Sequence, residues 1–468
     1  MKRLHFLDSF FYPSNVAIVG ASRNPLAVTY NLVVNLVKLG FSGEIYPVNP
    51  SADEICGIKA YPTLNDIDAD VDLVVSVVPA NVTMGIVNDC IKKKVKIILF
   101  VTGGFSEIGE EGSRVQDEIA YLLKQNGIRA IGPNALSPIN SANNLAINFH
   151  PLEELPRGGL SCIFQSGMYE YRISWVFSDF HLGISKLVDL GNKMDVTEVD
   201  VLEYLSEDPD TKIIGIHLEA VKGDGRELMW LLKSTSKKKP VIVLKSGRTT
   251  AGAKAAASHT GSLARGSDAI FDTALKQAGV IRARTLEDML DFAKAFEFQN
   301  LPNGRRMMVI SSSGGDGVVV TDLCQQADFL MAKPSQSTFD KVKAIFPPWE
   351  IPLNPFDLGV CFHFHNPIEV YDVFIRSVLD DDNVDCLVVE IPPIEIMLKP
   401  EEFCYEAFVL AKEKGKSIAV WRPAINGSED KLAERLESNG VPVYPSAIRA
   451  IEALSAIYRY KTMHQDDD

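Results

Sequence analysis

A histidine set among small residues is the feature of this sequence best suited to chemistry. His259 follows the run Ala-Ala-Ala-Ser and precedes Thr-Gly-Ser, so no bulky apolar side chain adjoins it. Imidazole can act as a nucleophile toward phosphorus or a carbonyl carbon. Small neighbours indicate a segment that can move, or one that a large group must approach. The alternative is a surface-loop histidine beside a helix cap, because lone histidines seldom do chemistry.

An apolar strand followed by a Gly/Ser turn and a helix occurs three times, and this pattern predicts the fold class. The strands and turns are expected at 16–19 and 20–25, at 160–164 and 165–167, and at 307–310 and 311–317. Such a unit opens a doubly wound α/β domain, and ligands bind at its turn beside the positive end of the first helix. The chain is therefore predicted to contain three α/β domains and up to three anion sites.

Further elements agree with parallel sheets. Continuous apolar runs are typical of strands buried on both faces. Strands are expected at 44–48, 73–78, 97–101, near 130, and at 213–218, 241–244, 386–391 and 418–421. Helices are expected at 28–39, 80–92, 110–126 and 200–205. A length of 468 residues also suggests about three domains. We predict domains at 1–150, 156–298 and 304–462, with linkers rich in Pro, Gly and charge near 150–159 and 299–305.

Composition excludes some classes of function. The chain has 47 Lys and Arg against 61 Asp and Glu, a net charge of −14, which disfavours nucleic acid as a ligand. A small phosphate-bearing ligand stays possible, because backbone amides can bind it. The seven cysteines form no CxxC pair, as expected for reduced thiols in the cytoplasm. Neither a signal peptide nor an apolar run of 18 residues is found, so no membrane span is predicted.

The first turn favours a ligand other than a nicotinamide dinucleotide. The NAD fingerprint requires three glycines and an acid after the second strand. Here the turn at 20–25 has one glycine, and the second strand ends Val-Asn-Pro. Arg23 places a positive charge beside the helix start, which suits a nucleotide with an extra phosphate, such as coenzyme A. The loops at 77–81, 101–105 and 131–134 are expected to face the same crevice, although each could be an ordinary strand–helix turn.

Together these segments resemble the α subunit of ADP-forming acyl-CoA synthetases, in the succinyl-CoA synthetase superfamily. The most specific motifs are Ser-His-Thr-Gly-Ser-Leu-Ala at 258–264 and Leu-Gly-Asn-Lys-Met-Asp at 190–195. Others lie at 20–22, 45–50, 78–80, 102–107, 131–134, 165–167 and 354–358, so the resemblance spans almost the whole chain. It implies a Rossmann-like CoA-binding domain followed by two flavodoxin-like domains.

The resemblance also implies a reaction. Acyl-CoA, ADP and phosphate interconvert with a carboxylic acid, CoA and ATP, through an acyl phosphate and a phosphohistidine. His259 matches the histidine that carries the phosphoryl group, and its small neighbours suit a loop that travels between sites. Glu219, which follows the strand at 213–218, resembles the glutamate that orients the ring. Its alternative is an exposed acid at the end of a strand.

Two helix starts are expected to hold the phosphate, although plain tight turns are the alternative. The matching residues are Ser166, Gly167, Met168, Gly314 and Gly315. Backbone amides are expected to make most contacts to CoA. The CoA positions implied by the resemblance are Gly20, Ala21, Ser22, Arg23, Asn49, Val78, Pro79, Ala80, Thr102, Gly103, Gly104 and Asn134. Asn134 is expected near the thioester, or else as a cap of the turn after Pro133.

The sequence departs from the family pattern at several positions. Leu26 stands near a common lysine, Met168 replaces a small residue, and Asp316 replaces proline. We expect Asp316 to point away from any phosphate and to cap its helix. Tyr171 matches a tyrosine near the carboxylate substrate, so its bulk either narrows the acid pocket or packs beneath the helix. The departures favour an alternative, a catalytically weak or regulatory CoA-binding protein of the same fold. A dehydrogenase is disfavoured by the missing glycines.

Partners and cofactors follow from the resemblance as well. It implies an ATP-grasp β subunit in a heterotetramer, which would bind most of the magnesium nucleotide, and a small carboxylic acid as substrate. The alternation Phe-His-Phe-His at 362–365 suggests a strand or loop edge. Because no cluster of carboxylates or cysteines accompanies these two histidines, no metal site is predicted.

Overall fold

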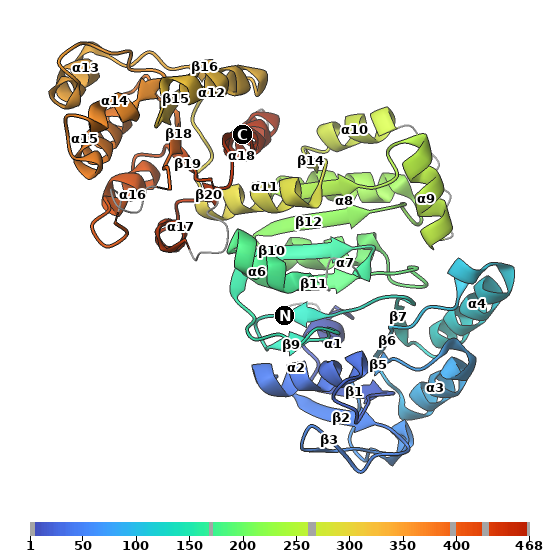
Figure 1. Ribbon diagram of the computed structural model, residues 1–468. Coiled ribbons are helices and arrows are strands. Elements are labelled where there is room, and N and C mark those ends of the chain that lie inside the picture. Colours follow the sequence, from blue (N-terminus) through green and yellow to red (C-terminus); the bar gives the residue numbers. More distant parts are fainter. Residues whose placement is uncertain (1–4, 168–171, 261–267, 394–398, 424–429, 466–468) are drawn as a thin grey trace. The chain divides into compact units, whose positions relative to one another are not determined.

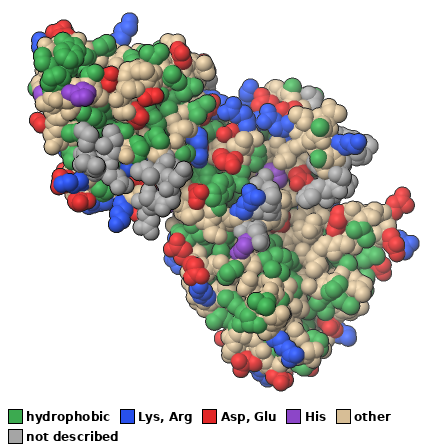
Figure 2. Space-filling view, viewed as in Figure 1, with side chains coloured by type: hydrophobic (Ala, Val, Ile, Leu, Met, Phe, Trp, Pro, Cys, Tyr) green, Lys and Arg blue, Asp and Glu red, His purple; other side chains and the backbone are tan. Residues whose placement is uncertain are grey.

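The computed structural model describes residues 5–167, 172–260, 268–393, 399–423 and 430–465; at 256–260 it describes the backbone alone. The chain forms two compact units, residues 1–284 and 285–468 (Figure 1). No helix in these ranges is both long and apolar enough to cross a membrane. On the face seen in Figure 2, acidic and basic side chains are interspersed over both units, so neither sign forms a continuous field there.

The first sheet is a five-stranded parallel sheet in the order β2-β1-β5-β6-β7. Its strands are β1 (Asn15–Val19), β2 (Glu44–Val48), β5 (Leu73–Ser76), β6 (Ile97–Phe100) and β7 (Arg129–Ile131). The connecting helices are α2 (Asn31–Leu39), α3 (Ala80–Lys93) and α4 (Glu110–Gln125), with the short helices η1 (Val28–Tyr30) and η3 (Ser106–Ile108). Every residue of β5 and β6 is buried, as their continuous apolar runs predict. The strand order reverses beside β1, and ligands of doubly wound sheets bind at that switch point.

The second sheet lies in the same unit and has seven strands in the order β14-β13-β12-β10-β11-β8-β9. Its parallel strands are β10 (Arg157–Phe164), β11 (Ile184–Asp189), β12 (Ile213–Leu218), β13 (Val241–Lys245) and β14 (Ile281–Ala283). Its helices are α6 (Ile173–Phe180), α7 (Glu198–Glu207), α8 (Gly225–Ser236), α9 (Thr250–Thr260) and α10 (Asp268–Gln277). The order reverses again, between β10 and β12.

Two short strands join the sheets of the first unit. β8 (Ile139–Asn140) and β9 (Leu145–Ala146) follow β7 along the chain, yet they pair antiparallel onto the edge of the second sheet. The buried core is also continuous, since Leu36 of α2 and Ile214 of β12 belong to one cluster. The two sheets are therefore packed into one body.

The second unit holds a third sheet in the order β16-β15-β18-β19-β20, with β17 also beside β15. Its strands are β15 (Arg306–Ser311), β16 (Leu330–Met331), β17 (Phe356–Asp357), β18 (Cys386–Glu390), β19 (Ser417–Trp421) and β20 (Val443–Tyr444). Its helices are α11 (Leu286–Phe298), α12 (Gly314–Gln326), α13 (Gln336–Val342), α14 (Leu358–Phe362), α15 (Pro367–Leu379), α16 (Tyr405–Glu413), α17 (Lys431–Ser438) and α18 (Ala447–His464). Three doubly wound, mainly parallel sheets confirm the predicted fold class.

Candidate active site

The first turn, residues 20–25, begins at the switch point of the first sheet. The amide of Gly20 donates to the carbonyl oxygen of Val48 at 2.9 Å, and its φ of +94° is one that favours glycine. A Cβ at this position would lie 3.1 Å from methyl carbons of both Val77 and Val78. Glycine is therefore required by the backbone conformation and by the close approach of the loop after β5.

Asn49 and Arg23 connect the first turn to the loop after β2. The side-chain amide of Asn49 donates to the carbonyl oxygen of Ala21 at 2.8 Å. The Arg23 guanidinium donates to the carbonyl oxygen of Ser51 at 3.0 Å and stays exposed to solvent. The structure thus brings these predicted residues together, with Asn49 shaping the turn and Arg23 placing a positive charge at its rim.

The loops after β5, β6 and β7 lie together at the same edge of the sheet. Thr102 Oγ1 donates to the carbonyl oxygen of Val78 at 2.7 Å. A Cβ on Gly104, whose φ is +104°, would lie 3.1 Å from that of Ala80. The amide of Asn134 donates to the carbonyl oxygen of Thr102 at 3.1 Å, and its side chain is exposed. Each loop that the sequence predicts for one crevice therefore contacts a neighbouring loop.

Glu107 is a residue of this edge whose role the sequence did not reveal. Its Oε1 accepts from the amide of Gly104 at 2.6 Å, and its Oε2 accepts from the side-chain amide of Asn192 at 2.6 Å. Burial raises the pKa of Glu107, but hydrogen bonds from its own amide, from Asn192 and from Gly104 outweigh burial, so the pKa falls below its ordinary value. An ionised carboxylate is thus held between the two sheets.

Residues 190–195, which follow β11 of the second sheet, contact the loops at the edge of the first sheet. The amide of Asn192 donates to the carbonyl oxygen of Pro133 at 2.9 Å. Gly191 has a φ of +50°, and a Cβ there would lie 2.2 Å from the carbonyl oxygen of Pro133 and 2.5 Å from that of Asn134. Only glycine allows the two backbones to approach this closely.

Glu219 is buried at the carboxyl end of β12, beside the turn after β10. Gln165 Oε1 accepts from the amides of Glu219 and Ala220 at 2.9 and 3.1 Å. Lys193 Nζ donates to the carbonyl oxygen of Ala220, and Lys245 Nζ donates to that of Glu219, each at 2.7 Å. The alternative of an exposed acid is therefore wrong for Glu219. The structure brings it next to the turn that holds Ser166.

Asp189 is a second residue that no sequence motif singled out as functional. Its side chain is fully buried and accepts from the amides of Leu136 and Gly191, each at 3.0 Å. A Cβ on Gly167 would lie 3.2 Å from Asp189 Oδ2, so this carboxyl adjoins the second glycine turn. Burial raises the pKa of Asp189 to about 7, and the negative charge of Glu219 adds to the rise.

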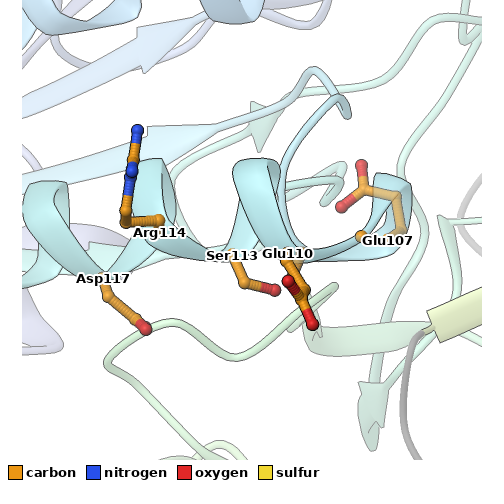
Figure 3. Close-up of a pocket in the computed structure, with 7 residues that line it drawn as sticks. Glu107, Glu110, Ser113, Arg114 and Asp117 are labelled. Carbon is orange, nitrogen blue, oxygen red and sulfur yellow. The ribbon is translucent and has the colours of Figure 1, made fainter.

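A cavity of about 530 Å³ opens at the start of α4, next to Glu107. It is lined by Ser106, Glu107, Gly109, Glu110, Ser113, Arg114 and Asp117. Figure 3 shows Glu110, Ser113 and Asp117 directed to one side of α4 and the Arg114 guanidinium directed to the other. The cavity borders η3, which α9 contacts, so it lies beside the helix that carries His259.

Two family models and several known proteins match this chain. Residues 14–139 match the family model of a CoA binding domain, and residues 157–296 match that of the succinyl-CoA ligase like flavodoxin domain. Over 98% of its length the chain is 35% identical to the ADP-forming acetate–CoA ligase I subunit alpha of Pyrococcus furiosus, of which it covers 99%. This chain belongs to the family of ADP-forming CoA ligases.

Other members of the ligase family extend the comparison. The ADP-forming acetate–CoA ligase of Methanocaldococcus jannaschii is 38% identical over 98% of this chain, which spans 64% of that relative. A solved structure of the dinucleotide-forming acetyl-coenzyme A synthetase 1 of Ca. Korarchaeum cryptofilum, in complex with phosphate and ADP, has a TM-score of 0.86 at 33% identity. The match covers 98% of this chain and 97% of that one.

Three of the predicted site residues, His259, Met168 and Tyr171, lie partly or wholly outside the described part of the structure. The backbone of His259 lies near the end of helix α9, and its side chain lies outside the described part. The backbone is helical as far as Thr260, so the prediction of a loop at His259 is wrong. Alanine is a strong helix former, which explains the helix in this alanine-rich segment. Met168 and Tyr171 also lie outside the described residues. Ser166 and Gly167 follow Gln165 directly and are half-buried.

The glycine turn of the second unit is surrounded by acids. Ser313, rather than Asp316, is the N-cap of α12: its Oγ accepts from the amide of Asp316 at 3.2 Å and donates to the Asp316 carboxylate at 2.6 Å. The expectation that Asp316 itself caps the helix is thus wrong. Glu390 Oε2 accepts from the amide of Ser312 at 2.6 Å. Burial raises the pKa of Glu390, and the nearby charges of Asp316 and Asp357 add to the rise. Gly314 and Gly315 themselves are exposed.

The Phe-His-Phe-His segment lies at the end of a helix. Phe362 closes α14, and the following turn contains the two histidines, so the segment is a loop edge and not a strand. The His365 ring is hydrogen-bonded through Nε2 to the carbonyl oxygen of Phe346 at 2.9 Å. Within the described ranges, no group of three or more His, Cys, Asp or Glu side chains could hold a metal ion.

Asp189→Asn tests the buried carboxyl through the pH dependence of stability. Between its ordinary pKa of 3.8 and the folded value of about 7, the folded protein holds a proton that the unfolded chain has lost. Stability contributed by this group therefore falls as pH rises through that window. The variant lacks the titration, so its unfolding free energy relative to the wild type is expected to rise by up to about 4 kcal/mol from pH 4 to pH 8. Urea unfolding at both pH values measures this, and a constant difference would contradict it.

Proposed function

We propose that this chain is the α subunit of an ADP-forming acyl-CoA ligase. The enzyme interconverts acyl-CoA, ADP and phosphate with a carboxylic acid, CoA and ATP. The observation that carries the proposal is that the predicted CoA loops meet at the switch point of the first sheet and are joined through residues 190–195 to Glu219 and the turn at 165–167. A regulatory protein without catalysis is not favoured, because relatives of nearly full coverage are named as ligases.

CoA is the substrate that the first sheet would hold. Its phosphates would lie at the first turn beside Arg23, whose charge is exposed at the rim. Its thioester end would lie near Asn134, whose side chain is exposed beside the loop at 102–104. Gly20, Asn49 and Gly104 would act by setting loop shape, since each is engaged in contacts within the loops.

The chemistry would proceed in three transfers. A phosphate oxygen attacks the thioester carbonyl carbon, the carbon–sulfur bond breaks, and CoA leaves as a thiolate that takes up a proton. A ring nitrogen of His259 then attacks phosphorus of the acyl phosphate, and the carboxylate leaves. ADP finally accepts the phosphoryl group from the phosphohistidine. Glu219 would orient the His259 ring, and the helix start at Ser166 and Gly167 would hold the phosphate.

The second half of the reaction requires a partner. Two relatives are named as alpha subunits, which supports a β subunit for this chain too. We propose that an ATP-grasp β subunit binds the magnesium nucleotide, that the enzyme is a heterotetramer, and that the helix start at Gly314 and Gly315 also holds phosphate. None of the seven cysteines, all of which lie in the described residues, forms a disulfide, which supports the cytoplasm as the compartment.

Labelled ATP tests this function in the complex of the chain with its β subunit. The expected product is an acid-labile, base-stable phosphoryl group on this chain, which is discharged when acetate and CoA are added. In parallel, CoA but not NAD is expected to raise the melting temperature of the chain. A chain that CoA stabilises but ATP never labels would contradict the catalytic proposal and favour the regulatory alternative.

A further inference from the structure

The hydrogen-bonded pair Glu107 and Asn192 spans the two sheets of the first unit. We propose that this pair positions the glycine turn at 103–104 for CoA, so that CoA affinity depends on a contact made from outside the CoA-binding domain. The inference rests on the proposed function, which places CoA at this turn. Neither residue would touch CoA; both would act as positioning residues.

Glu107 determines the shape of the glycine turn. Its Oε1 lies 2.6 Å from the amide nitrogen of Gly104 and 2.6 Å from the place that a Cβ of Gly103 would occupy. The carboxylate therefore occupies the space beside Gly103, and it engages the Gly104 amide while φ of Gly104 is +104°. Without this acceptor the Gly104 amide would lose its hydrogen bond, and the two glycines could leave this conformation at little steric cost.

Asn192 fixes the carboxylate from the second sheet. Its Nδ2 donates to Glu107 Oε2 at 2.6 Å and to Gln116 Oε1 of α4 at 3.1 Å. Its backbone amide donates to the carbonyl oxygen of Pro133. The side-chain amide has a defined orientation, because turning it over would place Oδ1 against two acceptors. One residue thus joins η3, α4 and the loop after β7.

The charge on Glu107 makes the pair strong. Removing a hydrogen bond to an ionised carboxylate changes an equilibrium constant by roughly 10- to 150-fold. Both oxygens are used, so glutamine cannot replace glutamate without losing an acceptor. A free Gly103–Gly104 turn would have to be ordered when CoA binds, and the cost would appear as lost affinity.

Exchanging the carboxylate and the amide between positions 107 and 192 distinguishes loss of their hydrogen bond from general destabilisation of the fold. In Asn192→Asp, two carboxylates face each other, and CoA affinity is expected to fall about 30- to 100-fold. In Glu107→Gln, the fall is expected to be about 10-fold. In the double variant, the oxygen of the introduced glutamine can still accept from Gly104 while its amide nitrogen donates to the introduced aspartate. The Gln116 amide, which accepts from Asn192 in the wild type, can turn over and donate to the same aspartate. Affinity is therefore expected to recover to within about 5-fold of the wild type.

The measurement is calorimetric titration of CoA into the complex of the chain with its β subunit. ATP-dependent labelling of the chain, a half-reaction without CoA, is followed in the same preparations and is expected to change less than twofold. Glu110→Gln is the matched control: Glu110 lines the same cavity, is exposed, and is expected to leave CoA affinity within twofold. The Glu107→Gln variant carries the test even if Asn192→Asp fails to fold.

Two results would overturn the proposal. One is a double variant that binds CoA no better than the weaker single variant. The other is a loss of ATP-dependent labelling equal to the loss of CoA affinity, which would indicate structural damage rather than positioning. If the wild-type complex itself bound no CoA, the proposed function would fail and this inference with it.

Discussion

His259→Ala is expected to abolish acid-labile phosphorylation of this chain and to reduce ATP formation by about 10⁴-fold or more, because the phosphoryl intermediate loses its carrier. CoA affinity is expected to stay within twofold, because none of the residues proposed to hold CoA lies in α9, the helix that carries His259. Labelling with ATP in the complex measures the first effect, and calorimetric titration of CoA measures the second.

A second histidine provides the control for this variant. His363 is exposed in the turn after α14, in the second unit, and the proposed mechanism does not use it. His363→Ala is expected to retain full labelling and full ATP formation. Label that survives in His259→Ala, or that disappears in His363→Ala, would contradict the assignment of the phosphoryl carrier.

Gly191→Ala is expected to lower the unfolding free energy of the first unit by about 3 kcal/mol or more and to weaken CoA binding. The φ of +50° costs an L-residue about 1–2 kcal/mol. The new Cβ would also lie 2.2 Å from the Pro133 carbonyl oxygen, and backbone atoms cannot move aside without displacing the loop after β7. Chemical unfolding and CoA titration measure the two effects.

Gly40→Ala measures how much of the stability lost in Gly191→Ala comes from the positive φ alone. Gly40 caps the end of α2 with a φ of +73°, and nothing lies within 4 Å of the place for its Cβ. Its substitution is expected to cost only about 1 kcal/mol and to leave CoA affinity unchanged. If the two alanine variants lost equal stability, the close approach at Gly191 would have no energetic importance.

The sheets are predictable because parallel strands buried on both faces appear as uninterrupted apolar runs. The sequence places strands at 44–48 and 213–218, and β2 and β12 have those bounds. Helix α3 is expected at 80–92 and extends to Lys93. These elements depend on local patterns, which a single sequence displays fully.

Two sequence predictions are wrong, the loop at His259 and the helix cap at Asp316, because each local pattern also fits a second structure. Small residues around His259 suggest mobility, although a run of alanines also favours a helix, and α9 includes it. The spacing of Ser313 and Asp316 fits the Ser-x-x-acid signature of a helix start, so the true cap of α12 is recognisable in the sequence.

The site residues that the sequence did not reveal have hydrogen-bond partners far away along the chain. Asp189 accepts from an amide 53 positions away, and Asn192 reaches Glu107 across 85 positions. No periodicity or spacing connects such pairs. The motifs at 102–107 and 190–195 contain Glu107 and Asn192, so a resemblance can point to the segments but not to the bond between them.

The placement of β8 and β9 has a consequence for how this chain can be divided. The segment that follows the first sheet also supplies the edge of the second sheet. A fragment that began after residue 150 would lack β8 and β9 and would expose the hydrogen-bonding edge of β11. Such a fragment is therefore expected to aggregate, whereas one that begins before Ile139 keeps this edge covered.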